Sequence, residues 1–255
     1  MSENAEAIER LIEVMDRLLG PGGCPWDREQ SHESLKRYLI EESYEVIEAI
    51  DEKDMKKLQE ELGDLLLQVV FHSALAEREG YFDFADVVDT VKEKMINRHP
   101  HVFGTMELNS SDDVLNKWEG FKKKEGKKNL LEGIPRILPA LMRAMKMQEK
   151  AARVGFDWPE IEGALEKVRE EAEELCMASN PDEVKEEMGD LFFALVNISR
   201  MKNVEPEEAL QACNDKFARR LLYIEEKLKK EKQQFEDLEL AELDRIWEEA
   251  KTKGL

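Results

Sequence analysis

An acidic motif that occurs twice is the feature that most restricts how this chain can fold. Glu41-Glu42-x-x-Glu45 recurs as Glu170-Glu171-x-x-Glu174, and Glu61-Leu62-Gly63-Asp64 recurs as Glu187-Met188-Gly189-Asp190. An internal repeat of this kind indicates two copies of one structural unit. The gap between the acidic pairs is 16 residues from Glu45 to Glu61 and 13 from Glu174 to Glu187. This difference is expected if only the loop between two helices varies.

The correspondence continues beyond the acidic motifs. Lys94-Met95-x-Asn97-Arg98 matches Lys216-Phe217-x-Arg219-Arg220, and Trp118 with Lys122 matches Trp247 with Lys251. Residues 126–139 contain Gly133, Pro135 and Pro139, which are typical of a connecting segment. We therefore predict a first helical module over residues 1–125, a linker over 126–139 and a second helical module over 140–255.

The composition predicts an all-α fold. Only 13 Gly and 8 Pro occur in 255 residues, while Glu, Lys, Leu, Ala and Met, which favour helices, are abundant. Apolar residues at helical spacing begin at Ile8 and stop at Gly20-Pro21-Gly22-Gly23, and a loop with Cys24-Pro25-Trp26-Asp27 follows. Further helices are predicted over residues 34–51, 55–78 and 84–97.

The charge balance and the cysteines exclude several classes of protein. A net charge of −20 disfavours direct binding of polymeric nucleic acid, although divalent cations can still bridge local carboxylates to a small nucleotide. Three separated cysteines without a CxxC pair fit a reducing cytoplasm, which is the expected location. The most apolar run, residues 65–76, is interrupted by Gln68 and His72, so we expect no membrane segment.

The repeated acids occupy positions where an amphipathic helix normally carries apolar side chains. Glu42 lies between Leu39 and Val46 on a stripe that also contains Leu35 and Ile50. Three other acids also lie between apolar residues of a helical stripe, which gives the set Glu42, Glu61, Glu171 and Glu187. Each of these four is followed three residues later, one helical turn on, by a second acid: Glu45, Asp64, Glu174 and Asp190. We expect no basic residue on these stripes at neighbouring turns.

Four carboxylates gathered between two helices require a cation. Two like charges about 4 Å apart repel by roughly 4 kcal/mol at an effective dielectric near 20. Ligands that are all oxygen select hard ions, so we predict Mg²⁺, with Mn²⁺ as a possible substitute. A ferritin-like di-iron site would need Glu-x-x-His, where this chain has Asp. The alternative is that the acids form ordinary solvated helix faces, but two interrupted apolar stripes favour a metal site.

These motifs resemble the signature of the all-α nucleoside triphosphate pyrophosphohydrolase superfamily, and the MazG type above all. Three further segments carry the likeness to MazG: Cys24-Pro25-Trp26-Asp27-x-x-Gln30, Arg98-His99-Pro100-His101-Val102-Phe103-Gly104 and Ala151-Ala152-Arg153-Val154-Gly155-Phe156-Asp157-Trp158. The resemblance implies an enzyme that cleaves a (deoxy)ribonucleoside triphosphate between its α and β phosphates, with a water activated by Mg²⁺ as the nucleophile. Monophosphate and pyrophosphate would be the products.

The resemblance also implies roles for individual residues. In the second half, Glu171, Glu174, Glu187 and Asp190 would hold the metal and form the catalytic site, and Lys216, Arg219 and Arg220 would meet the phosphates. Trp247 would lie near the base or at the edge of the site. The first half keeps the acids Glu42, Glu45, Glu61 and Asp64 as metal ligands and Lys94 and Arg98 as nucleotide contacts, and Lys122 could reach a nucleotide. It has Asn97 where the second half has Arg219, so the second half is predicted to be the catalytic one.

A few helices per module cannot cover a face that contains both acids and long apolar runs. By resemblance, a four-helix-bundle-type core is completed by dimerisation, so we predict a homodimer in which like halves pair. The alternative function is a non-catalytic module that senses nucleotides or binds other proteins through its helices. His99 and His101 either face a metal or form a rigid loop, and Trp26 and Trp158 either pack as core or lid residues or stack on a base.

Overall fold

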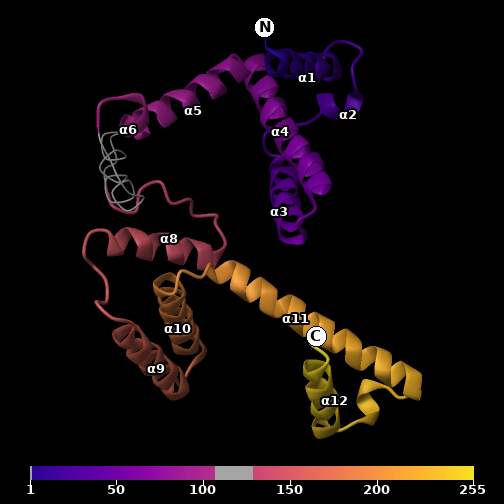
Figure 1. The fold of residues 1–255 in the computed structure, drawn as a ribbon, viewed down its shortest axis with the longest axis vertical. Coiled ribbons are helices and arrows are strands. Elements are labelled where there is room, and N and C mark those ends of the chain that lie inside the picture. The colour runs from indigo at the N-terminus through magenta and orange to yellow at the C-terminus, as the bar shows by residue number, and fades with distance from the viewer. Residues whose placement is uncertain (1, 107–128) are drawn as a thin grey trace. The chain divides into compact units, whose positions relative to one another are not determined.

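The computed structural model describes residues 2–106 and 129–255, and within these residues the chain forms helices joined by turns (Figure 1). It divides into two compact units, Met1–Phe121 and Lys122–Leu255. The helices of the first unit are α1 (Glu3–Leu19), α2 (Pro25–Arg28), α3 (Lys36–Glu52), α4 (Met55–Arg78), α5 (Phe84–Arg98) and α6 (Pro100–Phe103). Those of the second unit are α8 (Ala140–Ala152), α9 (Ile161–Met177), α10 (Pro181–Met201), α11 (Pro206–Glu231), the short 3₁₀ helix η1 (Phe235–Asp237) and α12 (Leu240–Thr252).

The centre of the first unit is the helical hairpin α3–α4. Lys53 ends α3 in the left-handed conformation, with φ of 56°. The side chain of Asp54 then caps α4 by accepting hydrogen bonds from the backbone N–H groups of Lys56 and Lys57, which would otherwise lack partners. This two-residue turn brings the acidic faces of the two helices together. α1 packs on α4, and the buried core beside the hairpin consists of Met15, Leu19, Leu35, Val70, Phe71 and Leu75.

The second unit repeats the hairpin with α9 and α10. The side chain of Asn180 caps α10 by accepting from the backbone N–H groups of Asp182 and Glu183, and Pro181 occupies the first helical position. α8 packs against α10 and α11, while α11 packs against α12 over a core formed by Ile224, Leu228 and Ile246. Both hairpins therefore have a capped second helix whose acids stand at the same distance from the cap.

The difference in gap length between the two copies has another origin than the one expected from the sequence. α3 continues for seven residues beyond Glu45, to Glu52, whereas α9 continues for three residues beyond Glu174, to Met177. The connecting segments differ by a single residue, 53–54 against 178–180. The expectation that only the loop varies is therefore wrong, because α3 is longer by four residues, about one helical turn, and its connecting segment is shorter by one residue.

The other helix predictions agree with the structure to within a few residues, and the helix predicted over residues 55–78 has those bounds. Two segments expected as loops contain the short helices α2 and α6. Part of the predicted linker lies on the second unit, where the buried ammonium group of Lys150 donates to the backbone oxygens of Leu130 and Glu132 at 3.0 and 2.8 Å. Among the described residues, no helix has the length and apolarity needed to cross a bilayer.

Candidate metal centre and adjoining cavity

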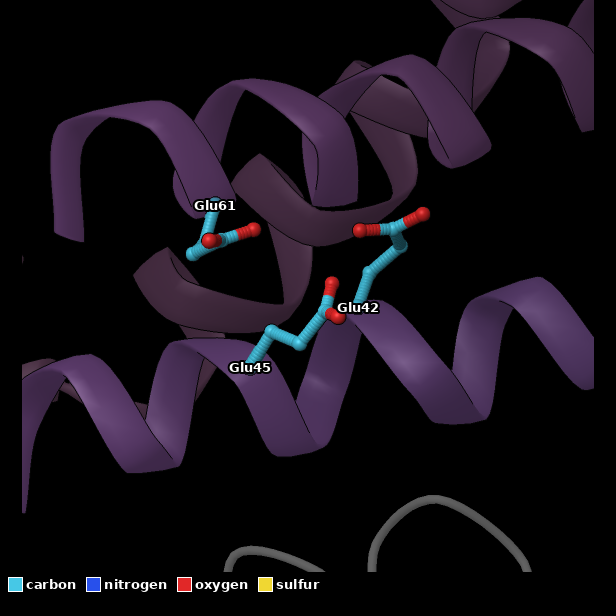
Figure 2. Close-up of side chains that lie close together, drawn as sticks. All are labelled: Glu42, Glu45 and Glu61. Atoms are coloured by element: carbon cyan, nitrogen blue, oxygen red, sulfur yellow. The ribbon is translucent and has the colours of Figure 1, made fainter. Parts of the chain in front are cut away.

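Three carboxylates of the first unit meet between α3 and α4. Figure 2 shows Glu42 and Glu45 extending from α3 toward Glu61 on α4. One carboxylate oxygen of each lies within 4.8 Å of those of the other two. Glu42 and Glu45 are one turn apart on α3, and the capped start of α4 places Glu61 opposite them. The hairpin thus converts the sequence spacing into a cluster of three acids.

Burial and mutual repulsion act on this first cluster in the same direction. The pKa of Glu42 is raised above 4.5, first by burial and then by the charges of Asp64, Glu45 and Glu61. The pKa of Glu61 is raised as well, by burial and by the charges of its acidic neighbours, among them Glu45 and Asp64. Asp64 is outside the group of three, but its charge acts on both carboxyls. The cluster therefore favours any cation that neutralises it.

The second unit forms a similar cluster with a different third member. Glu171 on α9 meets Glu187 and Asp190 on α10, again with carboxylate oxygens within 4.8 Å of one another. Glu171 is buried, with 4% of its surface exposed, while Asp190 is exposed. The pKa of Glu187 is raised by burial and then by the charges of Glu174, Glu171 and Asp190. Glu174 therefore lies near the cluster without belonging to its closest group.

The prediction that no basic residue shares these helix faces is wrong. The ammonium group of Lys167, one turn before Glu171, lies 2.6 Å from a carboxylate oxygen of Glu171 and 2.9 Å from Glu170. In the first unit, Lys57 of α4 pairs with Glu48 and Glu52 of α3, and its positive charge offsets part of the rise in the pKa of Glu61. Lys167 reaches along α9 to acids three and four positions on, a spacing at which helical side chains meet, whereas Lys57 reaches across the hairpin from α4 to α3.

The donor set of each cluster fits a hard divalent cation. Oxygen ligands around an octahedral Mg²⁺ lie about 3 to 4 Å from one another, because each lies about 2.0–2.1 Å from the ion. The carboxylate separations in both clusters are compatible with such spacing after small rotations of the side chains. In the described residues, neither trio contains the His or Cys ligand that would favour zinc or copper.

A cavity of about 860 Å³ adjoins the second cluster. It is lined along α10 by Asp190, Phe193, Asn197 and Arg200, residues that recur every three or four positions and therefore share one face of the helix. Lys167 and Glu171 of α9 line it as well. The loop of residues 155–158 and residues 130–131 form further walls. Its volume lies within the range of about 300–1,000 Å³ that is usual for small-molecule sites.

The residues expected to meet the phosphates and the base lie on other elements of the second unit. Lys216 and Arg219 are exposed on α11. Arg220 donates from Nε to the backbone oxygen of Leu255, and its guanidinium carbon lies 5.3 Å from the ring centre of Trp247 on α12. In the described chain, the residues lining the cavity do not include these four. Their roles toward a nucleotide stay predictions.

In the first unit, the corresponding residues are only partly described. Lys94 is exposed on α5, and Arg98 is the last residue of that helix. Lys122 and Trp118 lie outside the described residues. His99 and His101 flank the start of the short helix α6, with ring centres 5.6 Å apart, and Nδ1 of His99 lies 2.6 Å from the backbone oxygen of Met95. The expected rigid loop is thus a helical turn.

Several cavity residues were not recognised from the sequence. Arg200 pairs with Asp157 of the 155–158 loop and donates through Nε and Nη2 to Asn197 Oδ1. Gln148 of α8 is 7% exposed and donates to the backbone oxygen of Phe193 at 2.8 Å. The periodic signal was present, because Asn197 and Arg200 follow Asp190 at helical spacing. Only the fold shows that the loop closes over that face.

Comparison with protein families assigns both halves of the chain to nucleotide-cleaving domains. Residues 30–103 match the MazG nucleotide pyrophosphohydrolase domain, and residues 138–217 match phosphoribosyl-ATP pyrophosphohydrolase. Each matched segment contains one acidic hairpin. A helical pyrophosphohydrolase module that occurs twice is therefore the class of protein that the fold and the two clusters define.

Full-length relatives specify the class further. The chain is 48% identical over 254 residues to the nucleoside triphosphate pyrophosphohydrolase/pyrophosphatase MazG of Thermotoga maritima, and the match covers 98% of both chains. It is 41% identical to the nucleoside triphosphate pyrophosphohydrolase of Escherichia coli K12, over 97% of this chain and 98% of the relative. An uncharacterised Bacillus subtilis protein, YabN, is 49% identical over 93% of this chain and 50% of its own length. The chain belongs to the MazG family.

Proposed function

We propose that this chain hydrolyses (deoxy)ribonucleoside triphosphates between the α and β phosphates and releases monophosphate and pyrophosphate. The observation that carries the proposal is the pair of carboxylate trios, each held within 4.8 Å by a helical hairpin. The names of the full-length relatives support the same activity. Mg²⁺ is the proposed cofactor, with Mn²⁺ as a substitute, because the ligands are carboxylate oxygens.

In the proposed reaction, the residues of this chain bind the cation and orient the triphosphate. Glu171, Glu174, Glu187 and Asp190 would hold the cation, and the surrounding cavity walls would exclude bulk water from the phosphates. When bound, Mg²⁺ neutralises phosphate charge and lowers the pKa of a coordinated water, which is the proposed nucleophile. Lys216, Arg219 and Arg220 are proposed to supply positive charge to the phosphates, and one glutamate of the first acidic motif could accept the proton.

The second unit is the proposed catalytic half. Its buried acid, Glu171, and the exposed Asp190 open onto a cavity large enough for a nucleoside. The first unit has Asn97 at the position of Arg219, so it has one positive charge fewer at the corresponding site. We propose that the acids Glu42, Glu45, Glu61 and Asp64 bind metal, with Lys94, Arg98 and Lys122 as weaker nucleotide contacts.

We further propose that the protein is a homodimer in which like halves pair. α3 has an apolar stripe on its exposed surface, formed by Ile40, Tyr44 and Ile47, which recur at helical spacing and are 44–55% exposed. Large apolar patches on a single chain commonly mark interfaces. On α10, the exposed side chains of Phe192 and Leu195 present a similar surface in the second unit.

The test is the identity of the products. The protein is incubated with each nucleoside triphosphate and Mg²⁺, and pyrophosphate, orthophosphate and monophosphate are measured separately. The proposal predicts equal amounts of pyrophosphate and monophosphate. Release of orthophosphate with diphosphate would place the cleavage at the wrong bond, and lack of turnover with every triphosphate would favour a non-catalytic nucleotide-sensing or interaction module.

A further inference from the structure

The loop of residues 155–158 forms an aromatic wall of the cavity beside the second acidic cluster. Phe156 and Trp158 both line the cavity, but Phe156 is 83% exposed and Trp158 is 45% exposed. Glu171 and Asp190 line the same cavity. Along α10, the lining residues run from Asp190 to Arg200, a distance of about 15 Å at 1.5 Å per residue. The cavity therefore has an acidic end and, about one nucleotide's length away, an end where Phe156 and Trp158 stand beside the polar side chains of Asp157 and Arg200.

The position of Trp158 is fixed by the helix beneath it. A Cβ atom on Gly163 would lie 2.6 Å from Cε3 and 3.1 Å from Cδ2 of the indole, so the ring rests on α9 where the chain has no side chain. Any other residue at this position would displace the ring, because the clash is with its rigid edge. Gly163 therefore sets how far the indole lies from the cavity.

The backbone beside Trp158 is held by an ion pair. Asp157 Oδ1 accepts from the backbone N–H of Trp158 at 2.9 Å and also from the guanidinium of Arg200. Arg200, which is 13% exposed, donates in addition to Asn197 Oδ1 at 2.8 Å. This network attaches the loop to α10. The polar groups at this end thus bond to one another, which leaves the aromatic and aliphatic surfaces of the cavity to contact a ligand.

We propose that Trp158 is the residue on which the nucleobase stacks, and that Gly163 and the Asp157–Arg200 pair are positioning residues for its indole. This inference rests on the proposed function, since the acidic end would hold the phosphates of the same ligand. Stacking of a base on an aromatic side chain is worth about 1–3 kcal/mol, which corresponds to roughly 5- to 150-fold in a dissociation constant.

The experiment measures binding of adenosine without any divalent cation. Adenosine is uncharged, so the acidic cluster does not repel it and binding does not depend on hydrolysis. Titration calorimetry or ligand-observed NMR is applied to the full chain and to Trp158→Ala, Trp158→Phe, Gly163→Ala and Tyr81→Ala. Tyr81 is the control, because it is an exposed aromatic side chain, 76% exposed, in the first unit and away from its acidic cluster.

We expect Trp158→Ala to weaken adenosine binding by about 5- to 150-fold and Trp158→Phe to retain most of the affinity. Gly163→Ala should weaken binding without lowering Tm, because alanine favours the helix more than glycine. Tyr81→Ala should bind adenosine as the unaltered chain does. The same order is expected for KM with a triphosphate and Mg²⁺.

The proposal is overturned if the unaltered chain does not bind adenosine, if Trp158→Ala binds it equally well, or if Tyr81→Ala weakens binding to the same degree. Its failure is distinguishable from failure of the proposed function. A chain that binds adenosine through Trp158 but cleaves no triphosphate would keep the base site and contradict the enzyme activity. A chain that cleaves triphosphates with a KM insensitive to Trp158→Ala would keep the enzyme activity and contradict the base site.

Discussion

Lys167 supplies a positive charge to the buried acid of the second cluster. Its ammonium group contacts Glu171, which is buried, and Glu170, which is exposed. Burying a carboxylate is costly unless it is paired, so this contact supports the fold when no metal is bound. Because Glu171 is also a proposed metal ligand, lysine and metal compete for the same carboxylate.

We expect Lys167→Met to enlarge the rise in Tm that Mg²⁺ produces, because the ammonium no longer occupies Glu171. Free Mg²⁺ at about 100-fold over the dissociation constant of one site stabilises the folded chain by roughly 2.7 kcal/mol. Tighter binding at the same Mg²⁺ concentration increases this stabilisation. Differential scanning fluorimetry with and without Mg²⁺ measures the shift. Lys185→Met, on the neighbouring helix α10, is the control. A smaller shift in Lys167→Met would mean that the lysine assists metal binding.

His72 provides a pH-dependent contribution to stability in the first unit. Its Nδ1 lies 2.7 Å from Nδ1 of His32, with the rings parallel, so at least one ring must be neutral to accept the hydrogen bond. Burial, followed by the charge of His32, lowers the pKa of His72 below 6.5. This stability is present above pH 6.5 and is lost as the pH falls through the lowered folded-state pKa, because the unfolded chain binds the proton first.

We therefore expect the free energy of unfolding to decrease between pH 7.5 and pH 5, and to decrease less in His72→Gln, which cannot be protonated. Urea unfolding at several pH values measures both slopes. An equal slope in the unaltered chain and in His72→Gln would show that other groups cause the acid sensitivity.

At the scale of the helices, the sequence predicted most of what the structure contains. Apolar spacing and caps such as Asp54 and Asn180 are local signals, so the long helices and the acidic hairpins follow from them. The pairing of Lys167 with Glu171 could have been predicted, because the two residues stand four positions apart on one helix. The position of the loop at Asp157 could not, because it depends on tertiary closure. The extra turn of α3 could not be recognised from the sequence, because the number of residues between two motifs does not show whether they lie in a loop or in a helix.

Gly189 interrupts α10 with a residue that disfavours helices, and the packing of the single chain gives no reason for a glycine there. It lies within α10, and in the described structure a Cβ atom added there, or at the equivalent Gly63, meets nothing within 4 Å. Since glycine in a helix costs about 1 kcal/mol relative to alanine, we expect Gly189→Ala to raise the free energy of unfolding by about 0.5–1 kcal/mol. Urea unfolding checks the sign. A decrease would mean that a ligand or a second copy approaches this glycine closely.

At the scale of the whole molecule, the main expectation is the homodimer. Sedimentation at micromolar concentration should give twice the chain mass of 29.6 kDa. The double substitution Ile40→Glu with Ile47→Glu should shift it toward monomer, because it places charges in the exposed apolar stripe of α3. Leu240→Glu, which is 81% exposed on α12, is the control and should stay dimeric. A compact monomer in the unaltered chain would refute the assembly.

The central claim is that the carboxylate site occurs twice and that the second copy performs the hydrolysis. Its most direct test is the rate of pyrophosphate release from a nucleoside triphosphate with Mg²⁺ in Asp190→Asn and, separately, in the equivalent Asp64→Asn. Loss of a group that only supports a ligand costs about 10- to 100-fold, so loss of a ligand should cost at least about 100-fold. We predict that loss for Asp190→Asn and a partial loss for Asp64→Asn. The reverse order would contradict the assignment.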